Sequence, residues 1–148
     1  MIVRDALIGI TRLGLDTAPI IYFVEASPQY HAHCSPFFDQ IDNQAIEAFT
    51  SVILLTETLV HPLRNSDVYR LSAFRSLLLA TQGISTVSLT ITVAERAAQL
   101  RAVYNLRTPD TIQVATALAI GCDAFLTNDI NLKRVTELRV IVVGELSL

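Results

Sequence analysis

The strongest constraint on the fold is an alternation of short apolar runs with longer segments of helical periodicity. Because helical segments separate successive strands, the strands are expected to run parallel through βαβ crossovers. The strand segments are continuous apolar runs, as expected for a sheet covered on both faces. The sequence therefore predicts an α/β fold, a three-layer α/β/α arrangement with a parallel sheet of about five strands at 10–16, 45–50, 84–89, 124–127 and 138–143.

Capping residues predict where the helices begin and end. Polar residues, alone or directly before proline, favour helix starts. Thr92 has Glu95 three residues later, the pattern of a capping box. Gly83 and Gly121 are predicted to end helices. The predicted starts are Thr17, Ser35-Pro36, Ser51, Asn65 or Ser66, Thr92 and Thr108-Pro109.

The composition favours one core-rich domain over residues 1–148, since 51% of the residues are hydrophobic and 17% are charged. No run approaches the roughly 20 apolar residues of a membrane span, and the N-terminus lacks the pattern of a signal peptide. Cys34 and Cys122 do not make a disulfide framework. We therefore expect a cytoplasmic protein with free cysteines. The net charge of −3 does not favour an extended basic surface for nucleic acid.

Acidic residues fall where strands end or where the following helices begin. Asp16 ends the first predicted strand and Asp129 follows the fourth. Glu57 lies two turns into the helix after the second strand, and Asp110 lies in the first turn of the helix before the fourth. Ligands of open parallel sheets bind outside the carboxyl ends of the strands. At least three of these four carboxylates are therefore expected to meet at one edge.

Clustered carboxylates repel one another unless a cation joins them. Mg²⁺ and Mn²⁺ prefer oxygen ligands, and such ions can promote hydrolysis of a phosphodiester. Taken singly, Asp16, Asp110 and Asp129 are each consistent with a helix cap, a dipole partner or a turn residue. Glu57 stands in the apolar stretch LLTETLV, where a charge is costly without a partner or a function.

Three segments resemble the PIN-domain nucleases. They are LDTAPIIYFVE at 15–25, TSVILLTETL at 50–59 and RTPDTIQVATALAIGCDAFLTND at 107–129. The last is the most specific, because it joins Pro-Asp, a helix and a strand that closes in Thr-Asn-Asp. The resemblance covers about residues 13–143.

The resemblance implies an endoribonuclease that depends on Mg²⁺ or Mn²⁺. By position, Asp16, Glu57, Asp110 and Asp129 would hold the metal, while Thr17, Thr127 and Asn128 would line the site. Many bacterial members are VapC-type toxins that a cognate antitoxin protein holds inactive, and homodimers are common. The same four acids also serve members that are not toxins.

Some features fall outside this resemblance. The chain carries an N-terminal extension, Met1–Arg12, and a His61-Pro62 pair without an assigned role. The segment HAHC at 31–34 is interpreted as a helix start or loop rather than a zinc site, since a second ligand pair is missing. Tyr22 and Phe23 are predicted to be core residues rather than base-stacking ones. Lys133 and Arg134 follow Asp129 closely and are the predicted phosphate contacts.

Two other functions compete with the nuclease. A receiver domain would need Asp where the third strand has Ser88, and an aspartate-nucleophile phosphatase would need Asp at Ala18. A catalytically silent PIN-like module that binds RNA or protein would usually lack one of the four acids.

Overall fold

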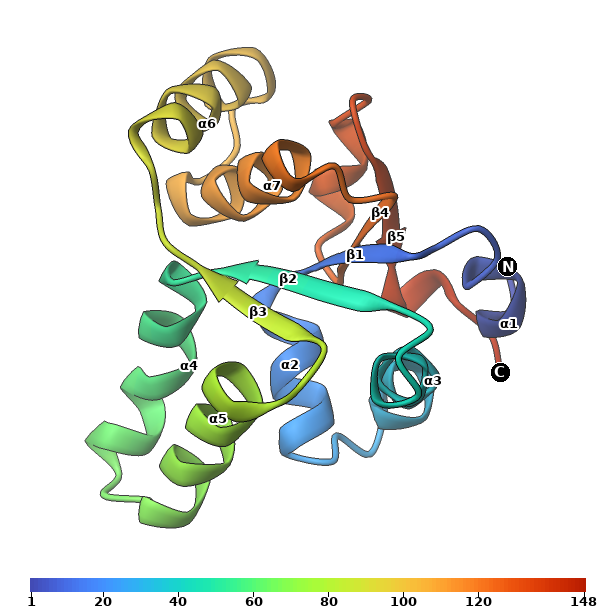
Figure 1. Cartoon of the computed structure of the whole chain (residues 1–148), viewed down its shortest axis with the longest axis vertical. Helices are drawn as coiled ribbons and strands as arrows, with labels where there is room; N and C mark the ends of the chain where they lie inside the picture. The colour runs from blue at the N-terminus through green and yellow to red at the C-terminus, as the bar shows by residue number, and fades with distance from the viewer.

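The computed structural model describes all residues, 1–148 (Figure 1). Its elements follow the predicted alternation of strands and helices. In chain order they are α1 (Val3–Ala6), β1 (Arg12–Leu15), α2 (Thr17–Val24), α3 (His31–Asp42), β2 (Glu47–Ser51), α4 (Ile53–Arg64), α5 (Val68–Ala80), β3 (Ile84–Val87), α6 (Ile91–Tyr104), α7 (Thr108–Ile120), β4 (Ala124–Thr127), the 3₁₀ helix η1 (Ile130–Arg134), β5 (Arg139–Val142) and the 3₁₀ helix η2 (Val143–Glu145).

The five strands form one parallel sheet in the order β3-β2-β1-β4-β5. This confirms the predicted fold class. The strand order reverses at β1, because the chain extends the sheet from β1 through β2 to β3 and then returns to place β4 on the other side of β1. The carboxyl ends of β1 and β4 therefore flank a topological switch point, the usual binding crevice of such sheets.

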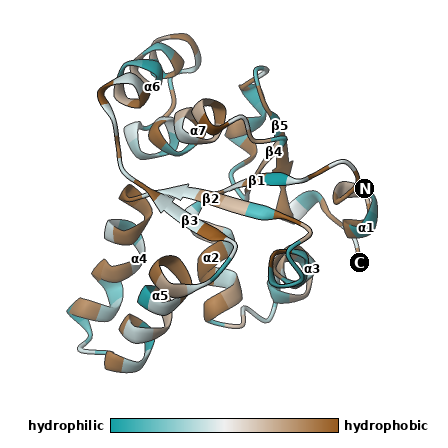
Figure 2. Ribbon diagram, in the orientation of Figure 1, coloured by the Kyte–Doolittle hydropathy of each residue, from teal (hydrophilic) through white to brown (hydrophobic).

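Helices cover both faces of the sheet (Figure 1). On one face, α1 to α5 pack on a core of 21 buried residues that includes Leu13, Leu15 and Phe37. On the other face, α6 and α7 enclose a second core around Phe125 and Leu100. Both hydrophobic and hydrophilic colours run along α4, α5 and α6 in Figure 2, as expected for helices with one face packed and one in solvent.

Two glycines have positions that other residues would strain. A Cβ at Gly14 in β1 would lie 2.8 Å from the Cβ of Ala117, so α7 packs directly against the backbone of β1. Gly121 ends α7 with φ +80°, the left-handed conformation expected of a glycine C-cap. The predicted stop at Gly121 is confirmed.

Several predicted helix starts were wrong by a few residues. Helix α3 begins at His31, so Ser35-Pro36 lies inside it. Helix α5 begins after Asp67, whose carboxylate accepts the N–H of Arg70. Helix α6 is capped by Thr90, whose hydroxyl accepts the N–H of Val93, rather than by Thr92. Helices α5 and α6 are capped by a different polar residue from the one predicted, and α3 begins one turn earlier.

The N-terminal extension packs against the far end of the chain. The N–H of Val3 donates to the carbonyl of Ser147 at 2.9 Å, and the N–H of Ser147 donates to that of Met1 at 3.0 Å. The guanidinium of Arg139 donates to the carbonyl of Ala6 at 3.0 Å. These contacts hold the short helix α1, which lies beside the C-terminus in Figure 1. None of the helices is both long enough and apolar enough to cross a lipid bilayer.

Candidate functional site

A polar cavity of about 410 Å³ opens at the switch point, beside the carboxyl ends of β1 and β4. All four carboxylates singled out from the sequence line it, although they come from four separate segments. The lining residues are Asp16, Thr17, Ala18, Ile21, Tyr22, Glu57, Arg107, Asp110, Asn128 and Asp129.

Asp16 is the most buried acid of this cavity together with Asp110, each with 7% of its surface exposed. It follows the last residue of β1 and caps α2, because its Oδ1 accepts the N–H of Thr17 at 2.8 Å. Its Oδ2 accepts the hydroxyl of Thr127 at 2.6 Å. Both oxygens are thus fixed by donors from the first turn of α2 and from the end of β4.

Two threonine hydroxyls connect the acids to one another. The hydroxyl of Thr17 donates to Oε2 of Glu57 at 3.0 Å, which ties α4 to the start of α2. The buried hydroxyl of Thr127 donates to Asp16 and accepts the N–H of Asp129 at 3.0 Å. Asp129 in turn accepts the N–H of Asn131 and begins the 3₁₀ helix η1. The geometry of the carboxylates is therefore set by side chains and turns of the chain itself.

Asp110 lies in the first turn of α7 and pairs with Arg107, a residue that the sequence analysis did not assign to the site. Nε of Arg107 donates to Oδ2 of Asp110 at 3.1 Å, and Nη2 lies 3.4 Å from Oδ1. The pKa of Arg107 is raised, first by this hydrogen bond and then by the charges of Asp110, Glu57 and Asp129. Arg107 precedes Asp110 by three residues, a spacing that brings paired charges together on a helix, and this spacing could have identified Arg107 from the sequence.

The pKa of Asp16 is raised from 3.8 to about 6. Burial is the main cause, since it disfavours the charged carboxylate. The negative charges of Asp110 and Glu57 raise this pKa further, whereas the hydrogen bonds from Thr127 and Thr17 lower it. The cavity thus concentrates more negative charge than Arg107 alone neutralises, and added positive charge would stabilise it.

Asn128 lines the cavity and is held there by two hydrogen bonds. Its Nδ2 donates to the hydroxyl oxygen of Tyr22 at 2.9 Å, and its Oδ1 accepts the N–H of Gly144 at 2.7 Å. Tyr22 was predicted to be a core residue, but it is half-buried and lines the cavity while it also packs against the core. Phe23 packs as predicted, stacked on Phe38 with ring centroids 4.0 Å apart.

Lys133 and Arg134 do not line the cavity. Helix η1 carries Lys133 to Glu145, where Nζ and Oε2 lie 2.6 Å apart. Nε of Arg134 donates to the carbonyl of Asn131 at 3.1 Å. Closeness to Asp129 in sequence therefore does not bring these cations to the acids, because the intervening turn directs them elsewhere.

The residues at 31–34 form the first turn of α3, the helix start of the two alternatives, helix start or loop, given for this segment. His31 begins α3 and stacks on Phe23 with centroids 5.6 Å apart. Cys34 is fully buried, and burial raises the pKa of its thiol to about 12. A thiol that stays protonated is a poor metal ligand.

The cavity has the donor chemistry of a site for a hydrated divalent cation. No three acidic, imidazole or thiol groups lie close enough together to hold one ion directly among them. Mg²⁺, however, is usually held by only one or two carboxylates and keeps several waters. The clustered hard oxygens, the uncompensated charge around Asp16 and the volume of about 410 Å³ fit an ion of that kind.

The family model of the PIN domain matches residues 14–138 of the sequence. The chain belongs to the PIN-domain family. This match contains the last two residues of β1, all of β4 and all four acids of the cavity. No curated protein matches the sequence.

Solved structures share this fold across nearly their whole length. VapBC2 from Rickettsia felis, bound to a DNA fragment from its promoter, is 15% identical with a TM-score of 0.70, covering 89% of this chain and 98% of the other. A toxin–antitoxin complex from Klebsiella pneumoniae is 19% identical with a TM-score of 0.67, covering 90% and 98%. VapC20 from Mycobacterium tuberculosis, a toxin that cleaves the sarcin-ricin loop, is 16% identical with a TM-score of 0.67, covering 87% and 99%. At these identities the likeness establishes the PIN fold.

Proposed function

We propose that this PIN-domain protein is an endoribonuclease that depends on Mg²⁺ or Mn²⁺. The observation that carries the proposal is the convergence of Asp16, Glu57, Asp110 and Asp129 on one cavity at the switch point of the sheet. Membership of the PIN family supports it independently. So does the cleavage of the sarcin-ricin loop by VapC20, a protein of the same fold.

The four acids would hold the cation, one or two of them directly and the others through its waters, and the bound cation would activate water and offset charge on the phosphodiester. Asp16 supplies a carboxylate that Thr17 and Thr127 keep in one orientation. Its raised pKa disfavours the ionised form, so a cation in the cavity would stabilise that form. Glu57 is held toward the same space by the hydroxyl of Thr17.

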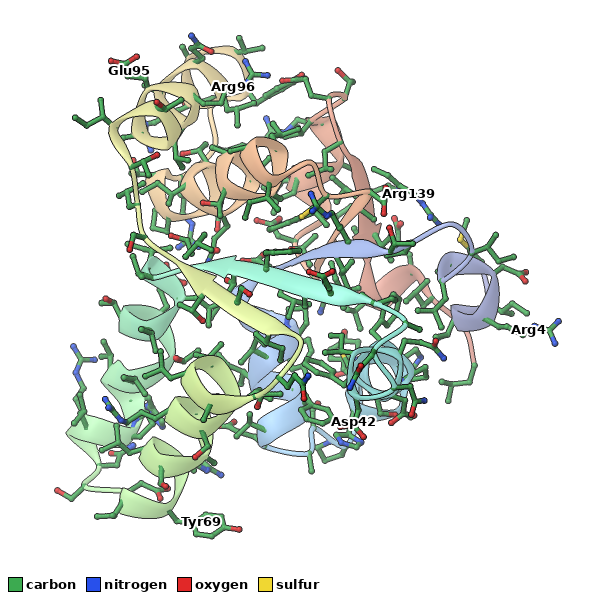
Figure 3. All side chains as sticks on the ribbon, viewed as in Figure 1. Arg4, Asp42, Tyr69, Glu95, Arg96 and Arg139 are labelled. Atoms are coloured by element: carbon green, nitrogen blue, oxygen red, sulfur yellow. The ribbon has the colours of Figure 1, made fainter.

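The first experiment is an RNA cleavage assay with the purified chain, with Mg²⁺ or Mn²⁺ and with chelator. We expect cleavage with either metal and none with chelator. Asp110→Asn keeps the size of the side chain but removes its charge, and should reduce the rate by more than about 100-fold. Asp42→Asn is the matched control, because Asp42 is exposed at the end of α3, away from the cavity (Figure 3).

The outcomes separate the two functions considered for this fold. Cleavage that is lost in Asp110→Asn but kept in Asp42→Asn supports the nuclease. Equal cleavage by both variants indicates a contaminating enzyme or a different site. An absence of cleavage across varied RNAs with Mn²⁺ would favour a silent module that binds RNA or protein.

We propose further that the protein is the toxin of a toxin–antitoxin pair in the cytoplasm. The similarity in fold to a Klebsiella pneumoniae toxin–antitoxin complex supports this role. Expression of the wild-type chain is then expected to arrest bacterial growth, and expression of Asp110→Asn is not. Growth at equal rates with both proteins at equal levels would contradict the toxin role while leaving the nuclease intact.

A homodimer is also proposed, through the exposed apolar residues of α4 and α5. Leu63 is 61% exposed and Val68 is 74% exposed, and Tyr69 points away from the body of the molecule (Figure 3). Exposed apolar patches of this kind mark interaction surfaces. Light scattering should give twice the monomer mass for the wild type and a smaller mass for Leu63→Glu.

A further inference from the structure

Arg107 is the one cationic side chain among the residues that line the acidic cavity. It stands directly before α7, with 76% of its side chain exposed, whereas only 10% of the side chain of its partner Asp110 is exposed. The two candidates suggested by sequence, Lys133 and Arg134, are engaged elsewhere. Any positive charge that this chain itself brings to the cavity therefore comes from Arg107.

The Arg107 guanidinium engages both oxygens of Asp110. Nε lies 3.1 Å from Oδ2 and Nη2 lies 3.4 Å from Oδ1, a fork-on-fork arrangement. Glu57 and Asp129 also act on Arg107 through their charges. The guanidinium therefore lies where a divalent cation would have to approach Asp110, and the two positive groups would repel each other.

Arg107 can leave Asp110 for solvent, because three quarters of its side chain is exposed. Asp110 is nearly buried, so it would release Arg107 only to a cation that replaces the lost positive charge. A cation that takes over Asp110 would free the guanidinium at the mouth of the cavity. There its fork of N–H donors matches the oxygens of a phosphate group, which it can bind in the same two-pronged manner.

We propose that Arg107 binds a substrate phosphate at this site. In the metal-free protein Arg107 is instead paired with Asp110. The exchange of partners couples the two events: the divalent cation displaces Arg107 from Asp110, and the released Arg107 binds RNA. Arg107 then contacts the RNA directly and positions it at the cavity. The inference rests on the proposed metal-dependent function of the cavity.

The test measures metal and RNA binding separately, in four proteins: wild type, Arg107→Gln, Arg107→Lys and Arg75→Gln. Arg75 is exposed on α5 and serves as the charge-matched control. Calorimetry with Mn²⁺ alone gives metal affinity. Fluorescence anisotropy with single-stranded RNA gives RNA affinity over a range of salt concentrations, with Ca²⁺ in place of Mn²⁺ and with intact RNA verified on a gel.

Arg107→Gln should bind Mn²⁺ up to about 5-fold more tightly, because the competing ion pair is gone. It should bind RNA about 10-fold more weakly. The slope of log affinity against log salt should fall by about 0.7, the loss of one phosphate contact on a single strand. Arg107→Lys retains the charge, so it should keep the salt slope of the wild type with a smaller loss of affinity. Arg75→Gln should match the wild type in both assays.

Unchanged or weaker Mn²⁺ binding by Arg107→Gln would overturn the competition, and an unchanged salt slope would overturn the phosphate contact. Both results leave the metal site standing as long as the wild type binds Mn²⁺. A wild-type protein that takes up no Mn²⁺ would instead refute the proposed function itself. Thermal unfolding of each variant identifies any change in folding. If Arg107→Gln is unstable, the smaller loss of RNA affinity expected of Arg107→Lys still tests the phosphate contact.

Discussion

Asp16 and Asp123 lie at opposite ends of the same two neighbouring strands, β1 and β4, and their environments are opposite too. Asp123 precedes β4 and is exposed. Its Oδ2 accepts the N–H groups of Arg12 and Thr11, each at 2.9 Å, and these bonds lower its pKa. Asp16 follows β1 and is buried, and its pKa is raised to about 6.

The ionised form of Asp123 therefore stabilises the fold, whereas the ionised form of Asp16 destabilises it. Asp123 satisfies backbone donors where β1 begins, so its charge is favourable in the folded protein. Asp16 also accepts hydrogen bonds, but burial and the charges of Asp110 and Glu57 outweigh them. Residues kept at such a cost are typical of functional sites.

The largest predicted contrast is in catalysis. Asp16→Asn should reduce metal-dependent RNA cleavage by more than about 100-fold, because it removes a charge from the cavity. Asp123→Asn, at the opposite edge of the sheet, should cleave within about twofold of the wild type. The measurement is the initial rate for each variant at a temperature where both are folded. Comparable losses in the two variants would show that Asp16 is no more important for cleavage than Asp123.

A smaller effect is expected when the orientation of Asp16 is disturbed without removal of its charge. Thr127→Val deletes the hydroxyl that donates to Asp16 and accepts from the N–H of Asp129. Loss of such a supporting contact reduces metal affinity or activity by about 10- to 100-fold. Thr116→Val is the control, since the hydroxyl of Thr116 is buried in α7 and donates only to the carbonyl of Ile112. A Thr127→Val protein as active as this control would show that the hydroxyl has no role in positioning.

Stability should change in the opposite direction from activity. Asp16 has a raised pKa, so the folded protein retains its proton over pH 4–6 while the unfolded chain loses it. Metal-free wild type should therefore lose stability as pH rises from about 4 to about 6 and change little above that range through this group. At pH 7, Asp16→Asn should raise the free energy of unfolding by up to roughly 3 kcal/mol. Asp123→Ala should lower it by about 1 kcal/mol, as for a lost cap.

Urea unfolding in the presence of chelator, at several pH values, measures these differences. The wild type and Asp16→Asn should converge near pH 4, where the wild-type carboxyl is protonated in the folded state. A gap that stays constant across pH would mean that packing rather than ionisation of Asp16 accounts for the effect.

The fold could be predicted because its signals are local. Continuous apolar strands separated by helices led to the parallel three-layer fold, and Gly121 marked the end of α7. The start of α3 and the capping of α6 by Thr90 could not be resolved, because several polar residues near each boundary compete for the same backbone donors. Helix α1 depends on contacts with Ser147, which no local pattern contains.

The sequence singled out the four acids that line the cavity, but it did not single out Arg107, the cationic side chain beside them. Asp16, Glu57, Asp110 and Asp129 were singled out because they follow strands or occupy helix turns near strand ends. Arg107 was missed because it is one of eleven lysine and arginine residues scattered through the sequence. Only the first turn of α7 distinguishes it, since that turn sets its guanidinium against Asp110.

The proposed metal site is tested most directly by a crystal of the wild-type protein soaked with Mn²⁺ and measured for anomalous scattering. We expect a manganese peak in the cavity bounded by Asp16, Glu57, Asp110 and Asp129. A peak in this cavity, with Arg107 withdrawn from Asp110, would support both the metal site and the exchange of partners. An empty cavity in crystals that bind manganese elsewhere would contradict a metal site at these four acids.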